Sequence, residues 1–152
     1  MFIIIIDTRE KLPFDFSIRG VQQEKTKLDT GDYAVKGLEH KLCIDRKVGA
    51  AELYSNVFQG YARFKKELLR MQDYERAIFV VENPYQEIID FPESLPKRAR
   101  AKVRFSSGDL VNKIEHIRDK YGVEFIFCEG RGNAQDIVFE ILRDVYHKNK
   151  HV

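Results

Sequence analysis

The hydrophobic residues of this chain form short continuous runs in one set of segments. Runs at 2–6, 77–82 and 123–128 are too short for helices and are rich in Ile, Val and Phe, so each predicts a buried strand. Residues 32–36 and 41–45 predict two further strands joined by a short loop as an antiparallel hairpin. Residues 14–28 show no clear period and are expected to be extended or loop.

A second set of segments has apolar residues at steps of three or four, which is the spacing of a helix face. This spacing predicts helices over 50–71, with an interruption at Gly60, over 110–121 and over 137–146. The element order is therefore strand, hairpin, helix, strand, helix, strand, helix. This order predicts an α/β fold, with a mixed β-sheet that contains an antiparallel hairpin and is flanked by helices.

Acidic residues occupy related places on the predicted strands. Asp7 follows the first apolar run, and a symmetric hairpin would place Asp32 directly opposite Asp45. Paired residues on antiparallel strands have Cβ atoms about 4.5–5.5 Å apart, and like charges so close destabilise a sheet unless something neutralises them. A divalent cation would do so.

Side chains alternate along a strand, so Lys47 shares a face with Asp45. Paired carboxylates suit hard cations such as Mg²⁺ or Mn²⁺, and a neighbouring lysine can orient or deprotonate an attacking water and stabilise charge on a phosphate. These residues together indicate metal-dependent phosphodiester hydrolysis.

The composition narrows the interpretation only a little. A chain of 152 residues with 43% hydrophobic composition is expected to form a single domain over 1–152. The net charge of +2 requires that any polyanion meet a local basic patch. Cys43 and Cys128 are expected to be reduced and buried. The apolar run at 2–6 is too short for a membrane span, so a cytoplasmic protein is expected.

Several segments, taken in order, resemble the nuclease domain of the XPF and archaeal Hef proteins, a branch of the PD-(D/E)XK nucleases. The resemblance covers roughly residues 3–82, and the ordered set is more specific than any one motif. The matching segments are Ile5-Ile6-Asp7-Thr8-Arg9-Glu10, Leu28, Gly31-Asp32-Tyr33, Ile44-Asp45-Arg46-Lys47, Glu52-Leu53, Arg63 and Val80-Val81-Glu82.

The resemblance implies a restriction-endonuclease-like core and a structure-specific endonuclease that cuts branched DNA such as flaps and forks. It implies metal binding by Asp32 and Asp45 with Asp7 close by, and catalysis by Lys47 assisted by Arg9, Glu10 and Arg46. The chain departs from the family pattern, since Asp45 replaces the usual Glu, Glu52 is displaced by one position and Glu67 stands where Gln is expected. The C-terminal helix-hairpin-helix module common in the family is not expected here.

Two groups of basic residues are candidate DNA contacts, since Lys and Arg side chains commonly bind phosphates. Arg63 and Lys66 lie on the helix predicted after the signature, and Lys97, Arg98, Arg100 and Lys102 lie in a long connection. A solvated surface is the alternative for both groups.

Two other functions remain open at this point. One is a four-way-junction resolvase acting as a homodimer. The other is an inactive DNA-binding or scaffold domain with the same fold. The four histidines show no zinc-like spacing and no Gly-x-Ser-x-Gly motif is present, so zinc sites and serine hydrolases are disfavoured.

Overall fold

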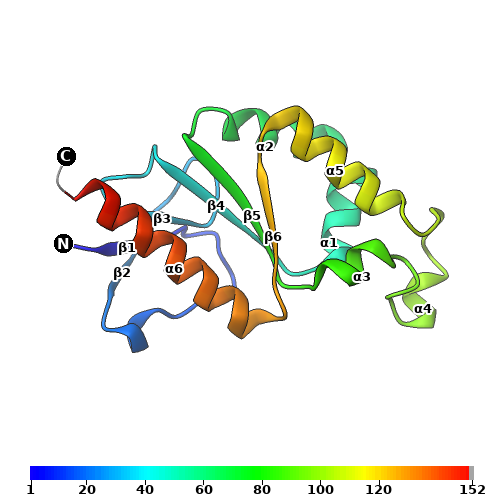
Figure 1. Cartoon of the computed structure of the whole chain (residues 1–152), viewed down its shortest axis with the longest axis horizontal. Coiled ribbons are helices and arrows are strands. Elements are labelled where there is room, and N and C mark those ends of the chain that lie inside the picture. The colour runs from blue at the N-terminus through cyan, green and yellow to red at the C-terminus, as the bar shows by residue number, and fades with distance from the viewer. Residues whose placement is uncertain (151–152) are drawn as a thin grey trace.

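The computed structural model describes residues 1–150 and contains one six-stranded mixed sheet with helices on both faces (Figure 1). The strand order is β2-β1-β3-β4-β5-β6. Strand β1 runs parallel to β2 and antiparallel to β3, β3 and β4 are antiparallel, and β4, β5 and β6 are parallel. The strands are β1 (Ile3–Ile6), β2 (Gln22–Lys25), β3 (Tyr33–Val35), β4 (Leu42–Lys47), β5 (Arg76–Val81) and β6 (Glu124–Phe127). The predicted α/β fold with an antiparallel hairpin is confirmed.

Each face of the sheet has its own hydrophobic core because side chains alternate along the strands. On one face, Phe79 and Phe125 pack against α1 (Ala50–Tyr54), α2 (Tyr61–Met71) and α5 (Asp109–Tyr121). On the other face, Ile44 and Ile78 pack against α6 (Arg131–Asn149). No helix within residues 1–150 is long and apolar enough to cross a membrane.

The two cysteines are buried and free, as expected. Cys43 belongs to the core beneath α2, whereas Cys128 belongs to the core beneath α6. They therefore lie on opposite sides of the sheet and cannot pair with each other.

The helix predicted over 50–71 is interrupted as expected at Gly60. It consists of α1, a single π-helical segment over Ser55–Gln59 (η2) and then α2. The N–H of Gly60 donates to the carbonyl of Ser55, five residues back, which closes the wide turn. The break redirects the chain, so that α2 begins anew at Tyr61.

Several short elements were not predicted from the sequence pattern. Strand β2 pairs with β1 within the segment expected to be extended or loop, and η1 (Ser17–Arg19) precedes it. Two short helices, α3 (Tyr85–Ile89) and α4 (Lys97–Arg100), lie in the long connection before α5. Each has five residues or fewer, which is too short to show a periodic pattern.

Part of the sheet face that carries α2 is left uncovered by helices. Over β1 and β3 the small cluster of Ile5, Leu28 and Ala34 forms the floor of a cavity of about 800 Å³. The segment 26–30 borders it on one side, and Arg70, Asp73 and Tyr74 border it on the other. This cavity and a smaller one beside it share Asp29, Thr30 and Arg70.

Candidate active site

Three aspartates lie in one row across β1, β3 and β4. Ile6 pairs with Tyr33, and Tyr33 pairs with Ile44, so the next positions bring Asp7, Asp32 and Asp45 side by side on one face. Two backbone hydrogen bonds hold this row, because the Asp7 N–H donates to the Asp32 carbonyl at 2.8 Å and the Asp32 N–H donates to the Ile44 carbonyl at 2.7 Å. The predicted pairing of Asp32 with Asp45 is confirmed, although β3 is shorter than expected.

Lys47 lies on the same face as Asp45, two residues further along β4. Its Nζ is 3.3 Å from Asp45 Oδ2 and about equally far, 5.5 and 5.6 Å, from the ring centres of Phe64 and Phe79. The ammonium group thus lies beside two aromatic rings and one carboxylate. The lysine is therefore buried as well as paired.

Glu67 of α2 joins this site, although it was noted in the sequence only as a departure from the family pattern. It lines the same cavity of about 270 Å³ as the three aspartates and Lys47, together with Arg9, Asp29, Thr30, Gly31 and Arg70. The available signal was positional, since Glu67 lies beside the buried residues Phe64 and Leu68 on α2. No sequence spacing could show that this part of α2 packs over Asp45.

The acidic groups of the cavity do not ionise alike. Burial, with the nearby charge of Asp45, raises the pKa of Asp32 to about 9. Burial and a hydrogen bond with Asp45 likewise raise the pKa of Glu67 to about 9. Burial alone would raise the pKa of Asp45, but the charge of Lys47 and the hydrogen bonds from Glu67 and Asp32 hold it below its usual value. At neutral pH Asp45 is thus the ionised member of this group, and its two neighbours retain protons.

The raised pKa values predict that the stability of the folded protein depends on pH. We expect Glu67→Gln to reduce this pH dependence. Asp32 and Glu67 lose their protons near pH 4 in the unfolded chain but near pH 9 in the metal-free folded protein. The folded state binds more protons in between, so the free energy of unfolding falls as pH rises from about 4 to about 9. A neutral glutamine removes one such group, and we expect a Tm at pH 8 higher by on the order of 5 °C.

Thermal melts of both proteins between pH 5 and 9 in EDTA measure this effect. Glu75→Gln is the matched control, because Glu75 is exposed and lies outside the cavity. Equal pH slopes in wild type and Glu67→Gln would show that Glu67 is not held protonated.

Arg9 and Asp7 form a pair at the edge of the cavity. Arg9 Nε lies 2.9 Å from Asp7 Oδ2, and the backbone N–H of Leu28 donates to Asp7 Oδ1 at 2.7 Å. Burial would raise the pKa of Asp7, but the hydrogen bonds from Arg9 and Leu28 keep it below its usual value. Asp7 is therefore charged, and the structure places both residues with the predicted site.

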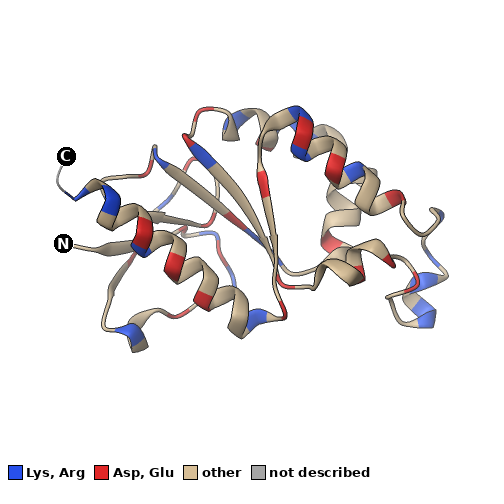
Figure 2. Cartoon of the chain, viewed as in Figure 1, with Lys and Arg blue, Asp and Glu red and all other residues tan. Residues whose placement is uncertain are grey.

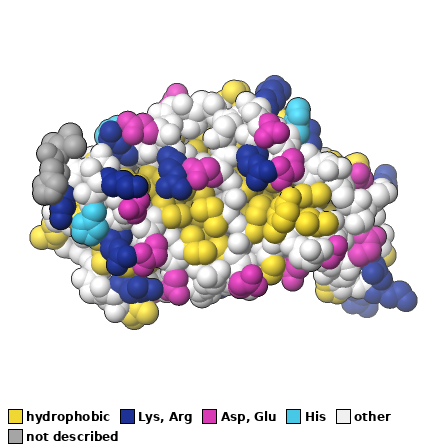
Figure 3. All heavy atoms as spheres, viewed as in Figure 1, with side chains coloured by type: hydrophobic (Ala, Val, Ile, Leu, Met, Phe, Trp, Pro, Cys, Tyr) yellow, Lys and Arg dark blue, Asp and Glu magenta, His cyan; other side chains and the backbone are white. Residues whose placement is uncertain are grey.

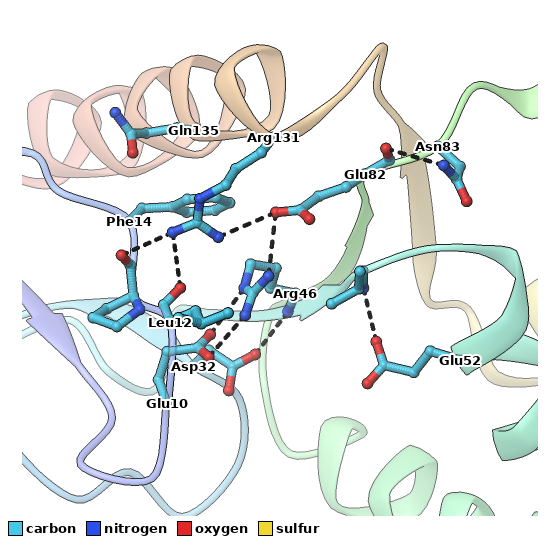
Figure 4. Close-up of polar contacts among 12 residues, drawn as sticks. Glu10, Leu12, Phe14, Asp32, Arg46, Glu52, Glu82, Asn83, Arg131 and Gln135 are labelled. Carbon is cyan, nitrogen blue, oxygen red and sulfur yellow. Dashed lines mark hydrogen bonds and ion pairs between the residues drawn. The ribbon is translucent and has the colours of Figure 1, made fainter.

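Glu10 and Arg46 lie in a second ionic group, which Figure 4 shows, and neither lines the cavity. Arg46 donates from Nε and Nη2 to the two carboxylate oxygens of Glu10 at 3.1 and 2.9 Å, and from Nη1 to Glu82 at 3.2 Å. All three side chains are at most 8% exposed. The backbone N–H of Arg46 donates to Asp32 Oδ2 at 2.7 Å, which connects the two groups. The catalytic assistance expected of Glu10 and Arg46 stays a prediction, and their side chains are positioned to support the site from behind.

The donor set of the cavity fits a hard divalent cation. Carboxylate oxygens are the ligands that Mg²⁺ and Mn²⁺ prefer, and Asp32 and Asp45 lie together with a proton retained between them. Within residues 1–150, no three His, Cys, Asp or Glu side chains are already arranged around one point as a metal ion would require. The Asp7 and Asp32 oxygens accept protein N–H groups instead.

The two candidate groups of DNA-binding residues differ in their relation to the cavity. Arg63 and Lys66 are exposed on α2, one turn from Glu67 and Arg70, so they lie beside the cavity rim. Lys97, Arg98 and Arg100 are on α4, and Lys102 follows it; none of them lines the cavity.

Glu52, from the displaced end of the signature, accepts the N–H of Val48 at 2.7 Å.

A comparison of the sequence with protein families is consistent with this row of acids on this fold. The family model of the ERCC4 domain matches residues 6–140, which is most of the chain. The chain belongs to the ERCC4 domain family. The match extends well past the segments that carry the resemblance in the sequence, and it includes β6 and the first half of α6. No curated protein sequence matches this ERCC4 domain closely enough to count as a relative.

Solved structures agree on the fold of the ERCC4 domain. XPF from Aeropyrum pernix superposes with a TM-score of 0.68 at 20% sequence identity, covering 93% of this chain and 60% of that one. A complex of XPF from the same organism with DNA also gives 0.68, at 21% identity, covering 97% of this chain and 66% of that one. The ERCC4 domain thus has the XPF nuclease fold, and it spans about 60–66% of the length of those structures.

Proposed function

We propose that this ERCC4 domain is a metal-dependent, structure-specific endonuclease that hydrolyses phosphodiester bonds in branched DNA such as flaps and forks. The observation that carries the proposal is the row of Asp7, Asp32 and Asp45 with Lys47 in one cavity. The XPF fold supports it, since one structure with this fold is a complex with DNA. The proposal needs no sequence-specific contact to bases.

Asp32 and Asp45 would hold Mg²⁺ or Mn²⁺, with Asp7 close enough to orient the site. The bound cation would supply Lewis acidity and would lower the pKa of a water ligand. In hydrolysis, the water oxygen bonds to phosphorus, the bond to one bridging oxygen breaks, and that oxygen leaves with a proton. The chain's own acids and Lys47 surround the place where this charge develops.

Lys47 acts as a charge stabiliser in this scheme. Burial would lower the pKa of its ammonium group, but the charge of Asp45 helps to raise that pKa above its usual value. Lys47 therefore keeps its proton at neutral pH and cannot accept one from water in the free protein. A fixed cation beside the reacting phosphate stabilises the transition state without reorganisation.

Arg63 and Lys66 would contact phosphates next to the cavity, and the basic segment at α4 would contact DNA further away. Figure 2 shows the Lys and Arg residues of α4 gathered at one end of the molecule, beyond α3. Such contacts position a duplex without reading its sequence. Two separated groups of contacts suit a substrate with a branch between two arms.

Removing two basic residues from either candidate DNA-binding group should weaken DNA binding. It should also reduce the dependence of that binding on salt. Each lost phosphate contact lowers the slope of log affinity against log salt by about 0.9 for duplex DNA. We expect Arg63→Gln with Lys66→Gln, and separately Arg98→Gln with Arg100→Gln, to lower the slope by about 1.8 each. Fluorescence anisotropy with a labelled fork in Ca²⁺ at several salt concentrations measures it.

The control removes two exposed cations from α6, Arg143→Gln with Lys148→Gln, and should leave the slope unchanged. A slope unchanged by the Arg98 and Arg100 pair would assign α4 to the solvated surface.

Cleavage assays with full-length protein test the proposed function. Labelled 3′-flap, splayed-arm, four-way and plain duplex DNA are incubated with Mg²⁺, Mn²⁺ or EDTA. Cutting of flaps or splayed arms that requires the metal supports the proposal. Paired symmetric cuts in the four-way substrate would instead indicate a resolvase acting as a homodimer, and branched-DNA binding without cutting in either metal would indicate an inactive scaffold domain.

A further inference from the structure

We propose that Arg131 is a positioning residue for the candidate active site. It lies at the first position of α6, and it holds the segment that follows β1 in place behind the aspartate row. The effect on cleavage rests on the proposed function, whereas the effect on the segment itself does not. Neither the sequence pattern nor the family resemblance singles out this residue.

Arg131 makes four contacts with residues far away in sequence, which Figure 4 shows in part. Its Nη2 donates to the backbone carbonyls of Leu12 and Pro13, both at 2.9 Å. Its guanidinium carbon lies 4.9 Å from the ring centre of Phe14, and its Nη1 lies 3.6 Å from Glu82 Oε1. One side chain thus binds three consecutive residues of the segment and the end of β5.

These contacts connect Arg131 to Arg46 through two shared partners. Glu82 accepts from Arg46 Nη1 at 3.2 Å as well as pairing with Arg131. The Arg46 guanidinium also lies over the Phe14 ring, at 5.6 Å from its centre. Glu82 is at most 8% exposed, so losing one of its two cations leaves a buried carboxylate less well compensated.

The ionic group of Glu10, Arg46 and Glu82 is connected to the aspartate row in two ways. The backbone N–H of Arg46 donates to Asp32 Oδ2, so the position of β4 at Arg46 sets that carboxylate. The segment that Arg131 holds, residues 8–14, follows Asp7 directly and includes Arg9, which pairs with Asp7, and Glu10, which is bound to Arg46. A shift of the segment therefore displaces Arg9 beside Asp7 on one side of Asp32, and Glu10 beside Arg46 on the other side.

Other contacts from α6 keep the next part of the segment in place without Arg131. Gln135 Oε1 accepts the N–H of Asp15 at 3.1 Å, and Arg19 pairs with Asp136 at 2.7 Å. Phe16 stays buried against Phe139. Replacing Arg131 is therefore expected to loosen residues 8–14 without unfolding the domain.

Arg131 is 43% exposed, so a direct contact with a DNA phosphate is the competing explanation. The two explanations differ in what they change. A phosphate contact governs DNA affinity and its salt dependence. A positioning residue governs the rate of the bound complex, because a misplacement of reacting groups by about 1 Å can cost about a hundredfold in rate.

The experiment compares wild type with Arg131→Gln, Arg131→Lys and the control Arg143→Gln, which removes a similarly exposed arginine from the same helix. Single-turnover cleavage of a splayed arm in Mg²⁺ gives the maximal rate, and anisotropy in Ca²⁺ gives the affinity. We expect Arg131→Gln to lower the maximal rate about tenfold to a hundredfold while the affinity changes less than about twofold. Arg131→Lys should recover only part of the rate, since lysine cannot bind two carbonyls and stack on Phe14 together.

Amide hydrogen exchange gives a second readout that needs no cleavage. In Arg131→Gln, exchange should rise across residues 8–14 and stay unchanged in β4 and β5, and Arg143→Gln should match wild type. Unchanged exchange in residues 8–14 overturns the proposal, and so does weaker DNA binding with an unchanged maximal rate. Wild type that cuts no substrate refutes the proposed function, while the exchange result still decides whether Arg131 holds the segment.

Discussion

Asp45→Asn is expected to lower the rate of metal-dependent DNA cleavage about a thousandfold, which corresponds to about 4 kcal/mol of transition-state stabilisation. Asp45 is the ionised acid at the centre of the cavity, between Asp32 and Glu67 and next to Lys47. An amide of the same shape retains one oxygen but carries no charge, so the site loses the negative charge that, in the proposed function, would bind the cation. Single-turnover cleavage of a splayed arm in Mg²⁺ measures the loss.

The matched control is Asp119→Asn, which makes the same chemical change at an exposed position of α5. Circular dichroism and DNA binding in Ca²⁺ establish that Asp45→Asn is folded and still engages its substrate. If folded Asp45→Asn cleaves at the wild-type rate, the row of aspartates is not the catalytic centre.

Lys47→Ala is expected to lower the maximal cleavage rate by about 10²–10³ while DNA affinity changes little. The side chain is buried and paired with Asp45, so it adds little to the binding surface, and under the proposed function it would stabilise charge on the reacting phosphate. The experiment measures rate and affinity separately, as for Asp45→Asn. Lys47→Arg should restore little of the rate, because the larger, planar guanidinium cannot put its charge at the same point beside Asp45 as the compact ammonium group of Lys47.

Small amines offer a check on this interpretation. Alanine at position 47 leaves space for an ethylammonium ion, and added ethylamine should restore part of the rate to Lys47→Ala and none to Asp45→Asn. A fall in DNA affinity that accounts for the whole loss would instead make Lys47 a binding residue.

The strands and long helices were predictable because each has a one-sided or continuous apolar pattern. The hairpin register followed from the symmetric spacing around residues 37–40, and it placed Asp32 opposite Asp45 correctly. Strand β2 was not predictable, since its sequence Gln-Gln-Glu-Lys shows no alternation. It pairs through its backbone at the sheet edge, where side chains need not be apolar.

The site was predictable only where its residues lie on adjacent strands. Asp32, Asp45 and Lys47 follow from strand pairing and alternation, which are local rules, whereas the place of Asp7 beside them was implied by the family resemblance. Glu67 depends on how α2 packs over β4, and Arg131 depends on contacts across more than a hundred residues. Alternation also placed Arg46 on the face opposite Lys47, but no spacing rule indicated that it would be enclosed by Glu10 and Glu82.

The two edges of the sheet differ in a way that bears on self-association. Strand β2 presents a polar edge, whereas β6 is the opposite edge and carries Ile126 and Phe127 among partly exposed apolar side chains of α3 and α6. In Figure 3, hydrophobic side chains lie at the middle of the face in view. Edge-to-edge contact through β6 would use the single apolar edge of each copy, so it would close after two molecules. Within residues 1–150, the opposite edge is the polar strand β2, so growth beyond two copies would require pairing with a polar edge.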